Sequence, residues 1–362
     1  MSTSESPGLK ERILAAERDG CLRDLLSSRV DAVDGAWSVV ADVTDGCRQG
    51  CLTCTARAPR VAQEVGVTEA LGEVLLPHAE FLAVGCLGEP LLHPDLPEIF
   101  RTLSRIKTGS GSGAFLCLLT AATVNGALEP LSGTGLEVLL VSADSTNPGA
   151  YARVRGGAHW TDTRAGLEAA GPALADGGVR LGAQSLLLRC TVRHARQTVV
   201  DLARLGVTSV TFTQPTQVPP RAKEEVLRQG DDVFSEVTDL EAWIAAGAGV
   251  PTIQLSLPRR PPELHGALRA RLGDGATWDE DRASGPAVCV APWFNLRVDS
   301  LGEVFPCNFM DDPGDALGNL REVGFEGLVC GAKARRIREV LLGGGAPTAA
   351  CARCAFGPGA QG

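Results

Sequence analysis

The chain has 362 residues, 44% of them hydrophobic, and a formal net charge of −9. This length and apolar content predict a globular protein with either one large α/β domain or two smaller domains. The 34 lysines and arginines are scattered along an acidic chain, which argues against a broad basic surface for nucleic acid. No apolar run reaches the ~18 residues of a membrane helix, and the N-terminus is polar without a signal-peptide pattern. We therefore expect a cytoplasmic protein without a membrane partner.

Short apolar runs alternate with helical patterns along most of the chain. Apolar residues at helical spacing within 9–29 predict an N-terminal helix. Strands are predicted in seven apolar runs: 37–43, 80–85, 114–120, 137–143, 181–190, 207–213 and 252–257. Helical stretches such as 95–106 and 195–205 separate them. This alternation predicts a parallel sheet with crossover helices, either open or closed into a barrel, with the chemistry at the carboxyl ends of the strands.

The composition changes near residue 285 to a segment rich in cysteine, glycine and proline. We interpret this change as the start of a second, smaller domain that is held together by metal. The predicted organisation is an N-terminal helical extension at 1–36, a main α/β domain at 37–284 and a metal-binding domain at 285–362.

Twelve cysteines in a chain without an export signal predict metal or redox chemistry rather than disulfides. Seven of them fall into two spaced sets. The first set is Cys47, Cys51 and Cys54, in the spacing Cys-x3-Cys-x2-Cys shortly after the run at 37–43. Three thiolates can hold three irons of a four-iron cluster and leave the fourth iron open to a ligand. By spacing alone the same triad also fits a partial zinc site.

Three further segments follow the next predicted strands: VGCLGEPLLHPDLPEIF at 84–100, TAATVNGALEPL at 120–131 and VSADSTNPGAYARVRGG at 141–157. With the cysteine triad, their order and spacing resemble the radical S-adenosylmethionine (SAM) superfamily across 37–257. The resemblance implies an α/β fold, a partial (β/α)6 barrel, in which Cys47, Cys51 and Cys54 hold a [4Fe-4S] cluster. In that family the open iron binds SAM, and an electron from the cluster releases a 5′-deoxyadenosyl radical.

The same resemblance assigns the SAM contacts. Gly88, Glu89 and Pro90 match the end of a Gly-Gly-Glu-Pro motif that receives the SAM ammonium, for which a carboxylate is a suitable partner. The other implied contacts are Ser142 and Asp144 to the ribose, Arg153 or Arg155 to the SAM carboxylate, and Asn125 near the site with its role open. Each arginine is equally compatible with a solvated charge on a helix.

Two positions depart from the family pattern. Thr53 replaces the aromatic residue that usually precedes the third cysteine, and Leu87 replaces the first glycine of Gly-Gly-Glu-Pro. Neither change removes a ligand. Part of the adenine contact must then come from elsewhere, and we expect it around 212–214.

The second set is Cys289, Cys307, Cys351 and Cys354. Four thiolates at this spacing, considered alone, fit structural zinc. The segment resembles the twitch domain, a truncated SPASM domain that follows radical SAM barrels and holds one auxiliary [4Fe-4S] cluster, so the resemblance implies two [4Fe-4S] clusters in all. Because the protein supplies all four ligands, we expect the auxiliary cluster to pass electrons rather than to bind substrate.

This compact pairing of clusters resembles aminoglycoside and aminocyclitol dehydrogenases and epimerases. The resemblance implies hydrogen abstraction from a secondary carbinol of an aminated sugar or cyclitol, in antibiotic biosynthesis. Loss of an electron to the auxiliary cluster then gives a ketone, whereas hydrogen donation by a thiol inverts the carbon. Cys190 and Cys330 are the candidate donors, and each also fits a small buried hydrophobe. The implied electron source is a flavodoxin or ferredoxin.

Two other functions fit parts of the pattern. Radical SAM modification of a ribosomal peptide or protein side chain uses the same chemistry, but such enzymes often carry an N-terminal peptide-recognition domain, and only 1–36 precede the first predicted strand. A non-catalytic, zinc-stapled binding protein would explain the seven cysteines. It would not explain why the LGEP, VNG and SADS segments all follow predicted strands.

Overall fold

The structure is a computed structural model that describes residues 12, 22–30, 37–54, 63, 65–213, 215, 218–227, 231–246, 252–255 and 289–354. Its described strands form one sheet in the order β10-β9-β8-β1-β2-β3-β4-β5-β6-β7. The strands are β1 (Trp37–Ala41), β2 (Ala79–Val84), β3 (Phe115–Thr120), β4 (Val138–Ser142), β5 (Arg180–Leu186), β6 (Ser209–Thr213), β7 (Thr252–Leu255), β8 (Asn295–Val298), β9 (Glu303–Phe305) and β10 (Gly318–Asn319).

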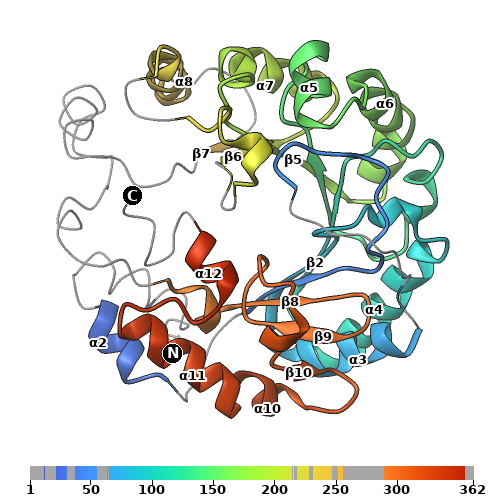
Figure 1. The fold of residues 1–362 in the computed structure, drawn as a ribbon. Coiled ribbons are helices and arrows are strands. Elements are labelled where there is room, and N and C mark those ends of the chain that lie inside the picture. Colours follow the sequence, from blue (N-terminus) through green and yellow to red (C-terminus); the bar gives the residue numbers. More distant parts are fainter. Residues whose placement is uncertain are drawn as a thin grey trace, which may run out of the picture.

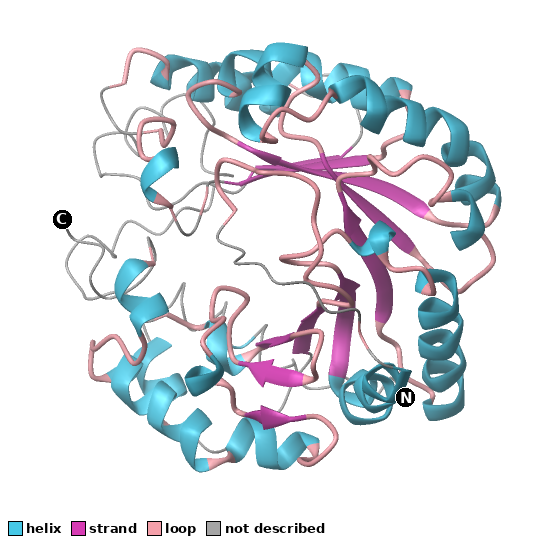
Figure 2. Cartoon of the chain, turned by 45° about the vertical axis from the view of Figure 1, so that its right-hand side comes forward, coloured by secondary structure: helices cyan, strands magenta, loops and turns pink. Residues whose placement is uncertain are grey.

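The sheet is curved, and helices cover its outer side (Figures 1 and 2). The helices are α2 (Leu22–Ser27), α3 (Val65–Leu75), α4 (Leu96–Ser110), α5 (Pro148–Val154), α6 (Trp160–Asp176), α7 (Ala195–Arg204), α8 (Phe234–Ala245), α10 (Phe325–Cys330), α11 (Ala332–Leu342) and α12 (Ala349–Arg353). Every neighbouring pair from β1 to β7 is parallel. Strand, crossover helix and strand therefore repeat along one barrel-like sheet, and the predicted α/β architecture is confirmed.

The two faces of the sheet carry different side chains because side chains alternate along a strand. Val39 and Leu82 belong to the large core beneath the helices. Their neighbours Val40 and Ala83 belong to a separate apolar cluster with Cys117, on the inner face. The inner face is thus built from the alternate residues of the same strands, and it is the face that a ligand inside the barrel would meet.

Helix α4 illustrates how the sequence forms the outer layer. Its buried residues recur at helical spacing: Leu96, Ile99, Phe100 and Leu103. The helix ends where Gly111 adopts the left-handed conformation, at φ 68°, and its amide caps the carbonyls of the last turn. The predicted helices at 95–106 and 195–205 correspond to α4 and α7.

The seven predicted strands are all present, as β1 to β7, with ends that differ from the prediction by a few residues. The last of them, predicted at 252–257, is described only to residue 255. Of the predicted N-terminal helix at 9–29, the structure describes residue 12 and the stretch from 22, which holds α2, while the remainder lies outside the described residues.

The C-terminal segment continues the barrel sheet instead of forming a sheet of its own. β8 pairs in parallel with β1, from Ser38 opposite Asn295 to Ala41 opposite Val298. β9 and β10 then follow as antiparallel neighbours. The two cysteine sets therefore lie on one continuous scaffold. The division at residue 284 stays a prediction, and it falls in 256–288, outside the described residues.

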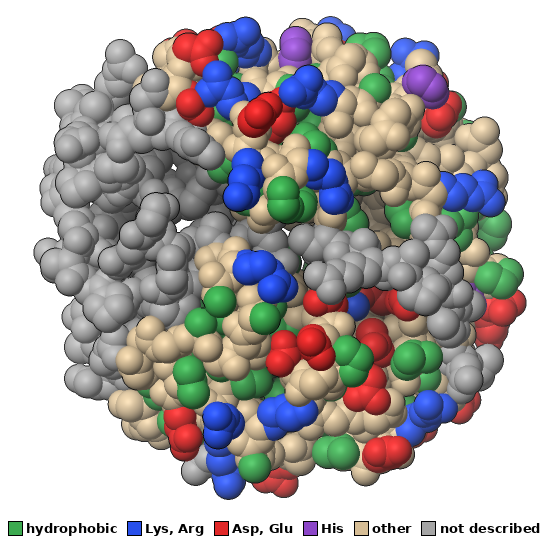
Figure 3. Space-filling view, viewed as in Figure 1, with side chains coloured by type: hydrophobic (Ala, Val, Ile, Leu, Met, Phe, Trp, Pro, Cys, Tyr) green, Lys and Arg blue, Asp and Glu red, His purple; other side chains and the backbone are tan. Residues whose placement is uncertain are grey.

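The surface bears both charge signs. On the face shown in Figure 3, basic and acidic side chains are interspersed without a continuous basic area. Among the described residues, no helix combines the length and the apolar character needed to cross a membrane.

Candidate functional site

The cysteine triad lies in the loop that follows β1. All three thiols are partly buried. Burial raises the pKa of Cys51 and of Cys47, and the neighbouring cysteine side chains of the triad raise both pKa values further. The three sulfurs are thus near one another, and in the free protein the Cys47 and Cys51 thiols hold their protons more firmly than an exposed cysteine does. Among the described residues, no three His, Cys, Asp or Glu side chains are grouped closely enough to hold a single ion.

Two neighbouring segments pack directly on the triad loop. The amide of Glu89 donates to the carbonyl of Gly46 at 2.7 Å, and the amide of Leu52 donates to the carbonyl of Val154 at 2.7 Å. A Cβ on Gly88 would overlap the carbonyl of Thr44. The segment after β2 is therefore locked against the cysteine loop by a backbone contact that only glycine permits.

We expect Gly88→Ala to destabilise the fold by about 3 kcal/mol or more, because the added methyl group meets backbone rather than a movable side chain. Chemical unfolding monitored by circular dichroism measures the loss. The control is Gly66→Ala in α3, where an added Cβ has open space and replaces a helical glycine. Equal stability of the two variants would contradict the packing described here.

Glu89 is a buried carboxylate held by three donors. It is 6% exposed and accepts hydrogen bonds from the hydroxyl of Thr120 at 2.5 Å, the amide of Ala121 at 2.9 Å and the amide of Leu91 at 3.1 Å. Desolvation outweighs these bonds and raises its pKa. Within the described residues Glu89 forms no ion pair, so a cation such as an ammonium group fits the chemistry of this position.

Arg153 and Arg155 have different environments. Arg155 is largely buried, its Nε lies 2.7 Å from the Oδ2 of Asp144, and its Nη1 lies 3.9 Å from the Sγ of Cys51. Burial opposes its charge, but Asp144 and Cys51 more than offset that cost and raise its pKa. Arg153 is 60% exposed and pairs with Glu225. Of these two arginines, Arg155 is therefore the one beside the Cys51 thiol, and a third, Arg221, donates to the carbonyls of Cys51 and Cys54.

The predicted ribose contacts and Asn125 lie in distinct places. Asp144 is committed to protein partners, since Oδ1 accepts from the amide of Leu186 at 2.9 Å and Oδ2 faces Arg155. Ser142 is half-buried on the inner face of β4. Asn125 is exposed on the turn after β3. Their contacts to SAM stay predictions.

An uncharged polar row crosses the inner face at the level of Ser142. The strand register places Ser142 opposite Gln184, and Gln184 opposite Thr211. All three are half-buried. In the part of the chain that the structure describes, none of these side chains forms a hydrogen bond. Of the region expected to contact adenine, Phe212 is buried in the outer core, Thr213 is half-buried, and residue 214 lies outside the described residues.

The two candidate donor thiols are carried by different elements. Cys190 follows β5, and its thiol contacts Glu225, so that burial and this carboxylate raise its pKa to about 12. Cys330 ends α10, whose Phe325 packs on His78 and on Trp37 at the amino end of β1. Cys330 is thus carried by a helix that packs at the amino end of the sheet, opposite the end that bears the triad.

A third thiol, Cys86, lies near the site although it belongs to neither cysteine set. It follows β2, packs with the inner-face apolar cluster, and interacts electrostatically with both Cys54 and Cys307, one cysteine of each set. Burial raises its pKa, so it is a neutral thiol. The sequence signal that marks it is its place directly before the Leu87-Gly88-Glu89 motif.

The four cysteines of the second set also gather. Burial, with contributions from Cys351 and Cys354, raises the pKa of Cys289 to about 11 and that of Cys307 to about 12. Cys351 lies in α12, which Thr348 caps by accepting from the Cys351 amide at 3.2 Å. Thiols from three separate segments that interact electrostatically with one another fit a fully ligated cluster.

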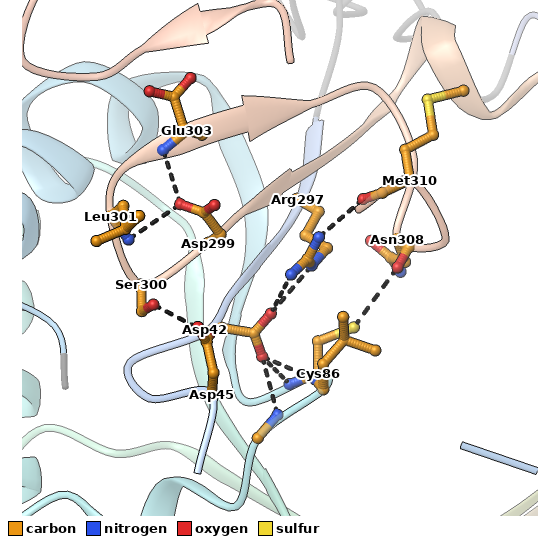
Figure 4. A network of polar contacts seen from close by, with 12 residues as sticks. Asp42, Asp45, Cys86, Arg297, Asp299, Ser300, Leu301, Glu303, Asn308 and Met310 are labelled. Carbon is orange, nitrogen blue, oxygen red and sulfur yellow. Dashed lines mark hydrogen bonds and ion pairs between the residues drawn. The ribbon is translucent and has the colours of Figure 1, made fainter. Parts of the chain in front are cut away.

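Sequence reasoning missed an ion pair between the two sets, Asp42 and Arg297 (Figure 4). Asp42 follows β1 and is fully buried, and Arg297 lies in β8 and is 4% exposed. The sequence does carry a signal for this pair, because Asp42 and Arg297 are charged residues within otherwise apolar strand segments, at 37–43 and 295–298.

Comparison with known proteins identifies the class of protein. The radical SAM superfamily model matches residues 42–175, and the SPASM model, an iron-sulfur cluster-binding domain, matches 289–355. The chain thus has one segment that matches the radical SAM superfamily and a C-terminal segment that matches an iron-sulfur cluster-binding domain. The first domain implies SAM and a [4Fe-4S] cluster, and the second implies a further iron-sulfur cluster. The triad, Glu89 and the four C-terminal cysteines described above fit these groups.

Curated relatives include two enzymes named GTP 3′,8-cyclase. The one from Microcystis aeruginosa is 29% identical over 210 residues, which are 55% of this chain and 50% of that protein. The one from Gloeobacter violaceus is 32% identical over 178 residues, 46% of this chain and 50% of that protein. The chain spans about half the length of these relatives.

Solved structures share the fold at low identity. SuiB of Streptococcus suis bound to S-adenosylmethionine superposes with a TM-score of 0.63 at 11% identity, covering 96% of this chain and 82% of that chain. SuiB bound to its precursor peptide SuiA gives a TM-score of 0.64 at 12% identity, covering 99% and 78%. The fold is therefore a partial radical SAM barrel with a C-terminal iron-sulfur region.

Proposed function

We propose that this chain is a radical SAM enzyme that abstracts hydrogen from a secondary carbinol of an aminated sugar or cyclitol. The observation that supports radical chemistry is the cysteine triad placed beside a buried carboxylate, Glu89, that forms no ion pair among the described residues. When bound, SAM and its cluster supply a 5′-deoxyadenosyl radical. In this proposal Glu89 holds the SAM ammonium, Arg155 stabilises the Cys51 side of the cluster, and Ser142 contacts SAM.

The inner face supports a polar substrate. Gln184 and Thr211 offer amide and hydroxyl groups with no partner among the described residues, which suits a polyhydroxylated molecule. Three arginines near the strand ends are paired, Arg155 with Asp144, Arg153 with Glu225 and Arg297 with Asp42, while the exposed Arg221 donates to the carbonyls of Cys51 and Cys54. Such paired cations give little attraction to a triphosphate, whereas an acidic chain suits an aminated substrate.

The fate of the substrate radical separates two reactions. Hydrogen-atom donation from a thiol gives an epimer and leaves a thiyl radical, which a proton and an electron passed through the C-terminal cluster would return to the thiol. Loss of an electron and a proton from the substrate radical, with the C-terminal cluster as electron acceptor, would instead give a ketone. The proposed donors are Cys190 and Cys330, to which the position of Cys86 adds a third. We assign the reducing electron to a flavodoxin or ferredoxin and place the reaction in antibiotic biosynthesis.

The test incubates reduced, cluster-loaded protein with SAM and candidate aminoglycosides in deuterated water. One deuterium at an inverted carbon identifies an epimerase, and a ketone identifies a dehydrogenase. In an epimerase, alanine at the donor position should divert product toward the ketone, while alanine at the other two of Cys86, Cys190 and Cys330 should not. Absence of substrate-dependent 5′-deoxyadenosine with every sugar and cyclitol tried would contradict the carbinol proposal.

A second candidate substrate is a nucleotide, and the observation that favours it is the similarity to the two GTP 3′,8-cyclases. GTP therefore belongs in the same assay, together with a ribosomal-type peptide as a representative of peptide modification. Consumption of GTP with formation of 5′-deoxyadenosine would support the nucleotide over the carbinol.

A further inference from the structure

Asp42 is an anchor for the loop that carries Glu89. Its Oδ1 accepts the amides of Leu87 at 2.7 Å and Cys86 at 2.9 Å, and the amide of Gly88 lies at 3.4 Å (Figure 4). The carboxylate is fully buried. The backbone directly before Glu89 is thus held by one charged side chain at the end of β1.

Arg297 joins this anchor to the second cysteine set. Its Nε and Nη2 lie 3.0 and 2.9 Å from the Oδ2 of Asp42, and its Nη1 donates to the carbonyl of Met310 at 2.8 Å. Met310 is three residues past Cys307, and its own amide donates to the Cys307 carbonyl at 3.3 Å. One guanidinium therefore holds the Cys307 loop with one nitrogen and the Glu89 anchor with the other two.

The connection is rigid for physical reasons. Two nitrogens of the Arg297 guanidinium contact one oxygen of Asp42 while the third donates elsewhere, which the single ammonium of a lysine cannot reproduce in the same geometry. Both partners are buried, so loss of one leaves the other charge without solvent to compensate it. A shift of the Cys307 loop would therefore be transmitted to the amides of Cys86 and Leu87.

We propose that Arg297 is a positioning residue that couples the two cofactor sites, so that loading of the C-terminal cluster at Cys307 strengthens SAM binding at Glu89. The proposal rests on the proposed function for the identity of the ligand, SAM, and on the described contacts for the coupling. Because binding free energies are linked, SAM should in turn stabilise the C-terminal cluster against loss.

The first test is a double-mutant cycle on the full chain, with SAM affinity measured by equilibrium dialysis. Arg297→Lys and Cys307→Ala, each alone, should raise the Kd for SAM about tenfold. The Kd of the double variant should also be about tenfold above that of the wild type, because the first substitution already removes the contact through which the second would act. An increase in Kd of about a hundredfold in the double variant, which is the product of two independent effects, would overturn the proposal. An unchanged Kd in Arg297→Lys would overturn it as well. Asp42→Asn, which keeps an oxygen for the loop amides, replaces Arg297→Lys if that variant does not fold, with the same expected non-additivity.

The second test does not depend on SAM. Hydrogen exchange of the peptide spanning 85–92 should accelerate in Arg297→Lys, because the Cys86 and Leu87 amides lose a fixed acceptor. The matched control is Arg338→Lys: Arg338 is 1% exposed and donates to the carbonyls of Pro292, Val30 and Val329, away from both loops. Arg338→Lys should lower global stability without selective exchange at 85–92. Unchanged exchange at 85–92 in Arg297→Lys would refute the coupling proposal, whether or not the wild-type protein binds SAM. A wild-type protein that binds no SAM would refute only the proposed function.

Discussion

Replacing Cys47, Cys51 and Cys54 together by alanine is expected to abolish SAM cleavage while the C-terminal cluster remains. The triad and the second set are built on different loops, and in each set the thiols interact electrostatically with thiols of their own set. Iron should fall from about eight to about four atoms per chain, since each four-iron cluster depends on its own thiolates. Production of 5′-deoxyadenosine should fall by more than about a thousandfold, because binding of SAM to an open iron is lost.

The measurement is iron and sulfide analysis after anaerobic purification, together with chromatography of 5′-deoxyadenosine. Cys117→Ala is the matched control, since this thiol is fully buried in β3 and belongs to neither set. That variant should keep all its iron. Zinc in place of iron in the wild-type protein, or unchanged iron in the triple variant, would contradict the assignment of the triad.

Glu89→Gln is expected to weaken SAM binding about a hundredfold. The carboxylate accepts from Leu91 and Thr120 on one oxygen and from Ala121 on the other. An amide can satisfy only one side, so its NH2 group would face a backbone donor, and the charge that would attract an ammonium is lost. Equilibrium dialysis with SAM measures the change in Kd.

The control for Glu89 is Glu137→Gln. Glu137 also accepts a backbone amide, that of Leu116 at 2.9 Å, and pairs with Lys107, but it lies at the amino end of β4. Glu137→Gln should leave the Kd for SAM unchanged. Equal Kd values for the Glu89 variant and the wild type would exclude Glu89 as the ammonium partner.

The raised pKa of Glu89 gives this prediction a pH dependence. The folded protein holds a proton on Glu89 at pH values where the unfolded chain has lost it, so the stability of the ligand-free protein should fall as pH rises through that window. A bound cation favours the carboxylate. SAM affinity should therefore increase with pH through the same window, and Glu89→Gln should flatten this dependence.

The sequence predicted the local features because their causes are local. Alternating apolar residues predicted β1 to β7, and cysteine spacing predicted which thiols would be near one another. It also placed the triad, Glu89 and Ser142 at the carboxyl ends of strands, since parallel strands end on the same edge of a sheet.

The sequence did not predict contacts between segments that are distant along the chain. Arg153 and Arg155 are two residues apart, so no pattern distinguishes them, and only the turn of α5 directs Arg155 to Cys51 and Arg153 to Glu225. The division near 285 was inferred from composition, which carries no information on pairing. The parallel pairing of β8 with β1 shows that the C-terminal strands extend the barrel sheet.

By itself the sequence determined where β1 to β7 lie along the chain and which seven cysteines form two spaced sets, because hydrophobic periodicity and cysteine spacing are properties of neighbouring residues. The tertiary structure decided how the two sets are connected. Asp42 and Arg297 are 255 positions apart, and they meet only because β8 closes against β1 and removes both charges from water. A buried charge must find an opposite charge wherever the fold supplies one, and that partner cannot be found from neighbours in the chain.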